Sequence, residues 1–320
     1  MKLVNRTGAV AYLQGVNLLE PELRAAVIIK KTYRLGPDGA LATAEDPLPL
    51  VPDQLVTGFG QFHGEVFFRK RGVDLCVLGT ARFDKRVTHA RLRLEVGRWR
   101  HELSLIGDRV WTKKRGGGEL VPSAPAPFKE MPVSYARAYG GSTEVNKEEV
   151  PYPDNPMGRG YYETPEQALG KPLPNIEPLN APAEPRWDTR IPVAGWGPYP
   201  MFWGLRARKA VKAHPETGKI LDVSPELFNH AHPDLILERI EPGSPVRSLG
   251  LRPAPLSFTV PRERPRVEVR VGSTVSEAFG ELDGLFLWAD ALRVVVTWRA
   301  RFRYPVRSEE LRGAELTFVE

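Results

Sequence analysis

The sequence predicts a mainly β protein, built as an antiparallel, β-sandwich-like unit with a long proline-rich, loop-rich middle region. Three observations predict this class. Segments near both ends alternate apolar and polar side chains with a period of two, which is typical of strands with one buried face. Signals for helices are few. Of the 31 prolines, 16 lie between residues 121 and 200, where they remove backbone donors and oppose long helices and central strands.

The prolines divide the 320-residue chain into three regions. We expect a strand-rich lobe over residues 1–120, an ordered layer of loops over 121–200, and a second strand-rich part over 201–320 that packs with the first. One domain over 1–320 is expected because neither strand-rich part is long enough to form a comfortable sandwich alone. No helix is expected to exceed about four turns.

The first region is interpreted as a series of short strands. Residues 91–99 alternate strictly, which places Leu92, Leu94 and Val96 on one face and charged side chains on the other. The basic run 113–115 precedes three glycines and is expected to form the tip of a hairpin. The other candidate strands are 25–34, 64–68, 73–79, 100–106 and 109–112.

The middle region is rich in aromatic residues, unlike a flexible linker. We therefore expect an ordered layer of loops packed against the strands. One short helical turn is expected over 163–169, with Thr164 as its N-cap and Pro165 at its first position. The aromatic residues of this region are Tyr135, Tyr139, Tyr152, Tyr161, Tyr162, Trp187, Trp196 and Tyr199.

The third region returns to strands. Residues 266–271 alternate strictly, and residues 292–303 form the longest candidate strand of the chain. Between them, residues 284–288 are followed by Ala289 and Asp290, which indicates a hairpin into the long strand.

The charge of the chain is balanced and spread along its length. It has 45 basic and 39 acidic residues, a net charge of +6, and it lacks the concentrated basic stripe of a nucleic-acid-binding protein. The single cysteine, Cys76, excludes an intramolecular disulfide and a zinc site built on cysteines. No apolar run is long enough to cross a membrane, and the first eight residues hold no signal-peptide core. We therefore expect a cytoplasmic protein with no nucleic-acid partner and no membrane insertion.

Motifs for catalysis are absent from the sequence, including the nucleophile elbow, the phosphate-binding loop and the zinc-protease motif. One constellation remains, from His230 to Asp234. In a strand, His230, His232 and Asp234 share a face and can ligate a metal, but Pro233 breaks a strand, and loops often hold histidines of this kind. We therefore expect no catalytic residue, no metal site and no bound cofactor.

Six short segments have specific and unusual patterns that place no nucleophile beside a base. Asn-Pro and Gly-x-Gly pairs build turns with fixed dihedral angles. Arg137, flanked by tyrosines, is expected to bury its guanidinium against rings and backbone carbonyls. The segments are Lys70 with Asp74–Gly79, Gly107–Trp111, Tyr135–Gly141, Asn155–Gly160, Phe228–Asp234 and Val294–Ala300.

In this order the six segments resemble the pattern of a bacterial family long catalogued as a domain of unknown function. The resemblance spans roughly residues 1–305. Genes of that family lie in type VI secretion clusters, beside the spike protein VgrG and toxic effectors. The resemblance therefore implies an adaptor or chaperone, not an enzyme, which binds an effector and loads it onto the VgrG spike. One departure follows residues 203–206, where the family pattern continues with Gly-Thr-Tyr-Asp and this chain does not.

The resemblance gives the family-motif positions a structural or partner-binding role. Asp74 and Arg137 are expected to be structural, with their charges satisfied by backbone groups or by partner side chains, because a buried charge must be paired. The family-motif residues are Asp74, Arg109, Trp111, Tyr135, Arg137, Tyr139, Gly140, Gly141, Asn155, Pro156, Gly158, Gly160, Phe228, Asn229, Pro233, Asp234, Trp298 and Arg299.

Contacts with the partner are expected from aromatic residues among the prolines of the middle region, since Tyr, Trp and Arg dominate binding hot spots. Proline-held loops also lose little entropy on docking. Two other classes stay open: a carbohydrate-binding β-sandwich that uses exposed tryptophans, and a metal-dependent enzyme that uses His230 and His232. The candidate contact residues are Tyr152, Tyr161, Tyr162, Trp196, Tyr199 and Trp203.

Overall fold

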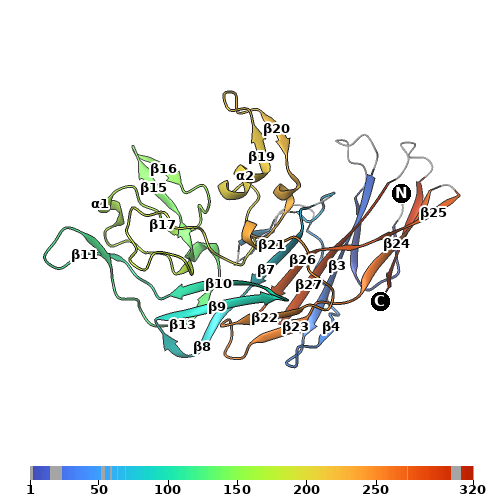
Figure 1. The fold of residues 1–320 in the computed structure, drawn as a ribbon, viewed down its shortest axis with the longest axis horizontal. Helices are drawn as coiled ribbons and strands as arrows, with labels where there is room; N and C mark the ends of the chain where they lie inside the picture. The colour runs from blue at the N-terminus through green and yellow to red at the C-terminus, as the bar shows by residue number, and fades with distance from the viewer. Residues whose placement is uncertain are drawn as a thin grey trace.

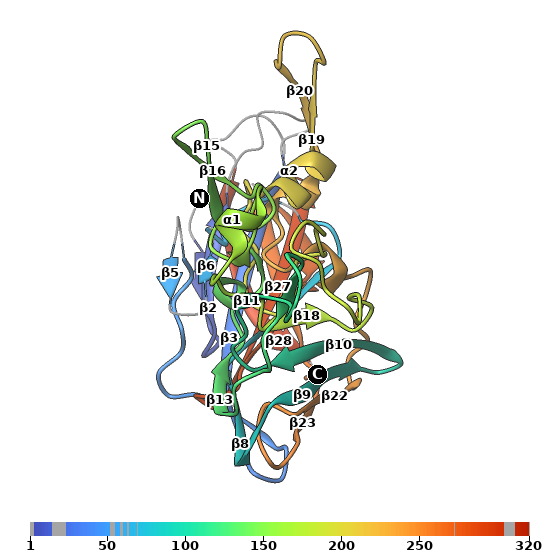
Figure 2. The ribbon, with the colours of Figure 1, turned by 90° about the vertical axis from the view of Figure 1, so that its left-hand side faces the viewer.

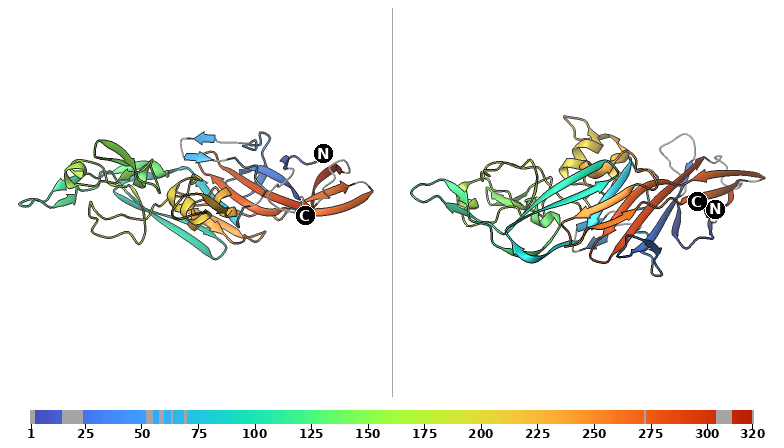
Figure 3. Two further views of the ribbon diagram at one scale, coloured as in Figure 1. Left: turned by 90° about the horizontal axis from the view of Figure 1, so that it is seen from above. Right: turned by 60° about the horizontal axis from the view of Figure 1, so that its bottom comes forward.

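The computed structural model confirms the predicted fold class: the protein is mainly β, with several antiparallel sheets and few helical residues (Figure 1). The molecule is elongated, with the sheets along its length and the loop-rich layer at one end (Figures 1 and 3). The structure describes residues 3–14, 24–51, 55–57, 60–62, 64–68, 70–271, 273–303 and 311–319.

The largest sheet has seven strands and joins both ends of the sequence. The two longest strands, β3 and β27, pair antiparallel from Arg34↔Arg293 to Arg24↔Arg303. The hairpin predicted around Asp290 is present as β26 and β27, while β7 runs parallel to β26. The strands are, in spatial order, β2 (Val10–Gln14), β3 (Arg24–Leu35), β27 (Arg293–Arg303), β26 (Glu281–Trp288), β7 (Val73–Leu78) and β21 (Ile236–Leu237), with β4 (Leu41–Thr43) paired to β3.

A second sheet of five strands contains the strictly alternating segment predicted from the sequence. Leu92, Leu94 and Val96 of β9 are buried, whereas Arg91 is exposed and Arg93 and Glu95 are half-buried. These leucines share one hydrophobic core with Val27, Leu75 and other residues of the seven-stranded sheet. The strands are, in spatial order, β18 (Ile176–Pro178), β10 (Trp99–Ile106), β9 (His89–Val96), β22 (Pro245–Leu249) and β23 (Leu256–Thr259).

A third sheet of four strands lies at the end of the molecule opposite the loop-rich layer (Figure 3). There β1 and β28, from the two ends of the chain, pair in parallel. The strands are, in spatial order, β1 (Leu3–Asn5), β28 (Leu311–Val319), β24 (Arg264–Val271) and β25 (Thr274–Phe279).

Six further strand pairs are small. The hairpin tip predicted over 113–115 is the turn between β11 and β12, closed by a hydrogen bond from Gly117 N–H to Lys114 C=O. The pairs are β8 (Thr80–Val87) with β13 (Phe128–Pro132), β11 (Trp111–Lys113) with β12 (Leu120–Pro122), β14 (Tyr139–Gly140) with β17 (Arg159–Gly160), β15 (Ser142–Val145) with β16 (Glu148–Pro151), β19 (Val211–Ala213) with β20 (Ile220–Val223), and β5 (Leu55–Thr57) with β6 (Gly60–Phe62).

Helices are short, as predicted, and none in the described part of the chain is long and apolar enough to cross a membrane. The turn predicted at residue 164 is α1, and Thr164 and Gln167 form its capping box. The helices are α1 (Pro165–Ala168) and α2 (Gly204–Ala210), with 3₁₀ turns η1 (Tyr135–Arg137), η2 (Pro225–Phe228) and η3 (Pro233–Leu235).

One predicted strand is wrong. Residues 64–68 form no strand. The Glu65 carboxylate is buried there and accepts hydrogen bonds from Lys30 Nζ at 2.7 and 2.8 Å and from Val51 N–H at 2.8 Å. A buried carboxylate requires such partners, and alternation of apolar side chains does not reveal them.

Candidate functional site

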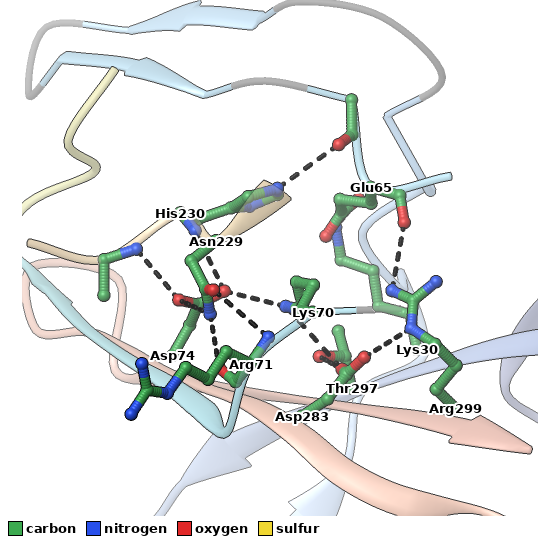
Figure 4. A network of polar contacts seen from close by, with 12 residues as sticks. Lys30, Glu65, Lys70, Arg71, Asp74, Asn229, His230, Asp283, Thr297 and Arg299 are labelled. Carbon is green, nitrogen blue, oxygen red and sulfur yellow. Dashed lines mark hydrogen bonds and ion pairs between the residues drawn. The ribbon is translucent and has the colours of Figure 1, made fainter. Parts of the chain in front are cut away.

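Three of the six motif segments meet in one buried polar network beneath the loops that precede β7 and follow η2 (Figure 4). We call it the Asp74 network. Asp74 lies on β7, between β21 and β26, while Asp283 lies on β26 and Arg299 on β27. Its members are Lys70, Asp74, Asn229, His230, Asp283 and Arg299.

Asp74 is the centre of this network and has no exposed surface. Its carboxylate accepts a hydrogen bond from Lys70 Nζ at 2.8 Å and one from Asn229 Nδ2 at 2.9 Å. The backbone N–H groups of His230 and Ala231 donate two more, at 2.9 and 3.1 Å. Four donors satisfy both oxygens, so the expectation that Asp74 is structural is supported by its geometry.

The charges of the network keep it ionised despite its burial. Burial alone would raise the pKa of Asp74, but the Lys70 ammonium and the backbone N–H of His230 hold that pKa well below its ordinary value. Burial would likewise lower the pKa of Lys70, and the carboxylates of Asp283 and Asp74 raise it instead. The ion pair therefore joins the strand β7 to the segment before it as two charges, not as a neutral pair.

The second half of the network connects β26 and β27. Asp283 accepts hydrogen bonds from Thr297 Oγ1 at 2.7 Å and from Arg299 Nε at 2.6 Å, and Lys70 Nζ lies 3.7 Å from its carboxylate. Arg299 Nη2 donates to the carbonyl of Glu65 at 3.3 Å. The motif residue Arg299 thus holds the irregular segment 64–68 against the sheet.

The two histidines of the segment 230–234 are both buried, but they contact different groups. His230 Nε2 lies 3.2 Å from the Gly64 carbonyl, whereas His232 packs its ring on Tyr135 and Tyr199. Burial lowers the pKa of His230 to about 3 and that of His232 to about 4. Pro233 begins a 3₁₀ turn, not a strand. Within the described ranges no three His, Cys, Asp or Glu side chains are grouped to hold a metal ion.

A second cluster of motif residues is centred on Asn155. Its Nδ2 donates to the carbonyls of Tyr135 and Tyr139, at 2.8 and 2.9 Å, and its own carbonyl accepts from Gly141 N–H at 2.8 Å. Asn155 has no exposed surface. The segments Tyr135–Gly141 and Asn155–Gly160 are therefore one unit, which the parallel pair β14–β17 completes.

The backbone segments of this unit approach each other so closely that its glycine positions leave no room for a Cβ atom. Gly140 has φ +142°, and a Cβ there would lie 2.1 Å from the Asn155 carbonyl oxygen. A Cβ at Gly158 would lie 2.6 Å from the Ala138 carbonyl oxygen. Gly160 has φ +103° and lies against the ring of Pro174, while Pro156 is half-buried in the same loop.

Replacing Asn155 by alanine is expected to cost about 2–3 kcal/mol of unfolding free energy, since two buried carbonyls lose their donor. Urea denaturation of the purified variant measures this loss. Met157→Ala is the matched control, because Met157 lies in the same loop and is 49% exposed; it should change stability by no more than about 0.5 kcal/mol. Equal losses for the two variants would contradict the role given to the Asn155 amide.

An ion pair holds the segment Gly107–Trp111 to the loop-rich layer. Arg109 is buried and donates to Glu177 at 2.6 Å and to the Pro174 carbonyl at 2.9 Å. Trp111 is buried in a small core of its own with Leu120. Both motif residues therefore pack the β11–β12 hairpin onto the loop-rich layer.

The burial expected for Arg137 is wrong. Its side chain is 29% exposed and contacts Asn175 Oδ1 at 3.2 Å and Asp108 at 3.6 Å, not tyrosine rings. Arg159 shares both partners, at 3.1 and 3.9 Å. The local sequence gave no sign of Asn175, which lies 38 residues away in the chain.

Among the described residues the most deeply buried arginine is Arg206, which the sequence did not single out. It is 1% exposed, packs over the ring of Tyr199, and donates to the carbonyls of Asn229 and Ala231. Burial lowers its pKa. Its position three residues after Trp203 was the only signal, and that spacing does not identify the carbonyls that it contacts.

Four other motif residues have ordinary structural positions. Trp298 is buried in the main core, and the ring of Phe228 packs on that of Phe67, with centroids 4.6 Å apart. Pro233 begins η3, and the Asp234 side chain is 65% exposed beside it.

Three of the six candidate contact residues are buried, which corrects the expectation that they lie on a partner-binding surface. Trp196 and Tyr199 have no exposed surface, and Tyr161 is 7% exposed. Trp196 Nε1 bonds to His101 Nδ1 at 3.0 Å, and the Tyr199 hydroxyl donates to a backbone carbonyl at 2.7 Å. In this fold their aromatic surface packs the loops onto the sheets.

The other three candidates are half-buried and also pack mainly against rings or backbone. Tyr152 lies against Tyr161, with centroids 5.2 Å apart. Trp203 contacts Tyr199 edge-on, with centroids 5.1 Å apart, and the Tyr162 hydroxyl donates to a backbone carbonyl at 2.8 Å. The prolines and aromatics of the middle region thus build the predicted ordered layer, and little of that aromatic surface is free for a partner.

A cavity of about 1080 Å³ lies beside the Asp74 network. The residues that line it include Lys70, Trp99, Asp283, Trp298 and Arg299. It combines apolar rings with charges that already have partners.

Comparison with known proteins agrees with the motif pattern. A family model described as "Uncharacterized protein conserved in bacteria (DUF2169)" matches residues 21–299. No curated protein and no solved structure matches the chain. Since the matched residues include five motif segments in full, the sixth up to Arg299, and most of the chain, this protein belongs to the bacterial DUF2169 family.

Proposed function

We propose that the protein is an adaptor that binds a toxic effector of a type VI secretion system and loads it onto the VgrG spike. The proposal begins from the family resemblance of the six motif segments. It places the protein in the cytoplasm before secretion, where effector and spike are both present.

The observation that carries the proposal is how the motif residues are used. Asp74, Asn229 and Arg299 hold β7, β26 and β27 to the loops above them, and Asn155 and Arg109 hold the loop-rich layer together. These side chains bond to the protein itself. Residues used in this way make a rigid body that presents loops at fixed positions, which favours tight docking because little entropy is lost.

Co-expression tests the proposal. The tagged protein is produced with candidate effector and VgrG proteins from the same bacterium, and complexes are isolated by affinity and size-exclusion chromatography. We expect a complex with the effector that buries at least about 1,000 Å² in total, and we expect effector to reach VgrG only when the adaptor is present. If the wild-type protein binds neither effector nor spike, the adaptor function is wrong.

Carbohydrate binding is a second candidate, favoured by the cavity beside the Asp74 network. The half-buried Trp99 lines it together with charged side chains, and ligand pockets combine aromatic surface with a few polar groups in this way. A glycan array with the wild-type protein distinguishes this function from the first, since an adaptor gives no signal there.

A further inference from the structure

The segment from Gly204 to Val223 forms an arm, which we define as α2 with the hairpin β19–β20. Two perpendicular views show the hairpin projecting from the sheets (Figures 1 and 2). Its base is firmly held: Arg206 donates to two buried backbone carbonyls, and Ala210 packs in a small core with Met201 and Leu227. The hairpin follows α2 directly, so a fixed base carries an exposed tip.

The arm concentrates exposed apolar surface. Among the described residues, the three most exposed large hydrophobic side chains are Phe202 at 75%, Leu221 at 62% and Ile220 at 61%. Phe202 comes just before the arm, and the other two lie on β20, all four residues of which are exposed. Successive side chains of a strand point to opposite faces, so Ile220 and Leu221 expose apolar surface on both faces of the hairpin.

The outer edge of β20 is open among the described residues. The two strands of the hairpin pair only with each other. Ser224 N–H donates to the Ala210 carbonyl, and Val211 lies opposite Val223. This combination makes Val211↔Val223 a non-hydrogen-bonded pair, whose N–H and C=O groups point away from the partner strand. The backbone N–H of Val223 therefore points to the open edge, where it donates to the exposed Asp222 carboxylate at 2.9 Å. A further strand can pair there by displacing that side chain.

The charge of the arm indicates which strand would pair. Exposed side chains between residues 208 and 222 include four cations and two anions; the cations are Arg208, Lys209, Lys212 and Lys219, and the anions are Glu216 and Asp222. Arg208 is bonded to Asp154 outside the arm, at 2.8 Å, and Lys212 Nζ lies 3.7 Å from the Asp222 carboxylate within it. The excess of positive charge therefore comes from Lys209 and Lys219, against Glu216. An acidic segment would be attracted to this edge, and a basic one repelled.

We propose that the arm docks an extended, acidic and apolar segment of a partner protein, which adds as a strand to the outer edge of β20. An added strand places side chains beside both Ile220 and Leu221, whereas a flat surface would cover only one face. Backbone pairing supplies affinity, and contacts with Ile220, Leu221, Lys209 and Lys219 supply specificity. This inference rests on the proposed function and names the surface that the effector or the spike would use.

Two synthetic ten-residue peptides test the chemistry without either partner. One alternates Glu with Val, and the other alternates Lys with Val. Fluorescence anisotropy should show binding of the acidic peptide and at least about tenfold weaker binding of the basic one. Equal binding of both peptides, or of neither, would overturn the inference while leaving the adaptor function to the co-expression experiment.

Three variants test the surface. Ile220→Ser with Leu221→Ser removes the apolar contacts. Val223→Pro removes the outward N–H, which makes no hydrogen bond to the other strand of the hairpin. Lys209→Glu with Lys219→Glu reverses the charge at exposed positions. Each should weaken acidic-peptide binding at least about tenfold with the thermal midpoint little changed. If the first two also lower the thermal midpoint, the charge-reversal variant alone decides, since exposed charges seldom affect folding.

The matched control is Val275→Ser on β25, another edge strand with an exposed apolar side chain, 55% exposed. It should leave binding unchanged, and an equal loss would overturn the assignment to the arm. Measurements on the same proteins test two other occupants of the arm. Sedimentation of the wild-type chain as a dimer that the Val223→Pro variant loses would indicate a second copy, and arm-dependent binding to phosphatidylserine vesicles would indicate a membrane; either result overturns the proposal.

Discussion

Replacing Asp74 by asparagine is expected to cost about 3–5 kcal/mol of unfolding free energy, enough to leave much of the protein unfolded at 37 °C. The substitution removes the charge that faces the buried Lys70 ammonium, whose side chain is only 4% exposed. It also places an amide where two backbone N–H groups donate. Urea denaturation followed by tryptophan fluorescence measures the loss.

A double-mutant cycle separates the ion pair from the rest of the site. Lys70→Met in the Asp74→Asn background should restore part of the lost stability, because it removes the charge left without its closest partner. Asp283 keeps its bond to Arg299 in that variant. As a surface control, Glu119→Gln breaks the exposed pair with Lys114 and should change stability by no more than about 0.5 kcal/mol. A loss below about 1 kcal/mol for Asp74→Asn would show that the network does not hold the fold.

The stability of the folded protein is expected to fall steeply between pH 6.5 and pH 4. His230 and His232 have folded-state pKa values lowered to about 3 and about 4, from 6.5 in an unfolded chain. In that window the unfolded state binds protons that the folded state does not, so protonation favours unfolding. At pH 5 the cost is about 2 kcal/mol for each histidine. The lowered pKa of Asp74 acts in the same direction, but only below its unfolded value near pH 4.

Urea denaturation at pH 7, 6 and 5 measures this dependence. Nuclear magnetic resonance of imidazole-labelled protein gives a second readout that needs no variant: the rings of His230 and His232 should stay neutral down to about pH 5. Gly64, Lys70 and Asp74 surround the first ring, and His101 and Asp234 lie near the second. Stability that is flat from pH 7 to pH 5 would contradict the burial of both rings as neutral groups.

The strands were predictable because their signal is local. The alternation from Arg91 to Val96 alone places the leucines inside. The long run over residues 292–303, which does not alternate strictly, and the turn at Asp290 predict β27 and its hairpin. Capping of α1 is also local, since Thr164 and Gln167 are three residues apart. The period of the alternation and the spacing of the capping residues are therefore enough to predict such elements.

The site was less predictable because its contacts are distant in sequence. Asp74 bonds to residues about 155 positions away, and Arg206 to carbonyls more than 20 positions away. Aromatic composition indicates an ordered layer but not which rings face inward, which is why the prediction that Trp196 and Tyr199 contact a partner is wrong. The exposure of Ile220 and Leu221 was not predictable from the sequence, because a short apolar run is usually buried.

The pairing of β3 with β27 has a consequence for how the protein is made. About 260 residues separate the two strands along the chain, and at typical translation rates the ribosome needs on the order of tens of seconds to make them. During that time the apolar run from Ala25 to Ile29, buried in the finished sheet, has no partner strand on that side. The central sheet thus closes only late in synthesis, and the nascent chain exposes an aggregation-prone strand until then. A protein that we propose to guard another polypeptide would itself need protection while it is being translated.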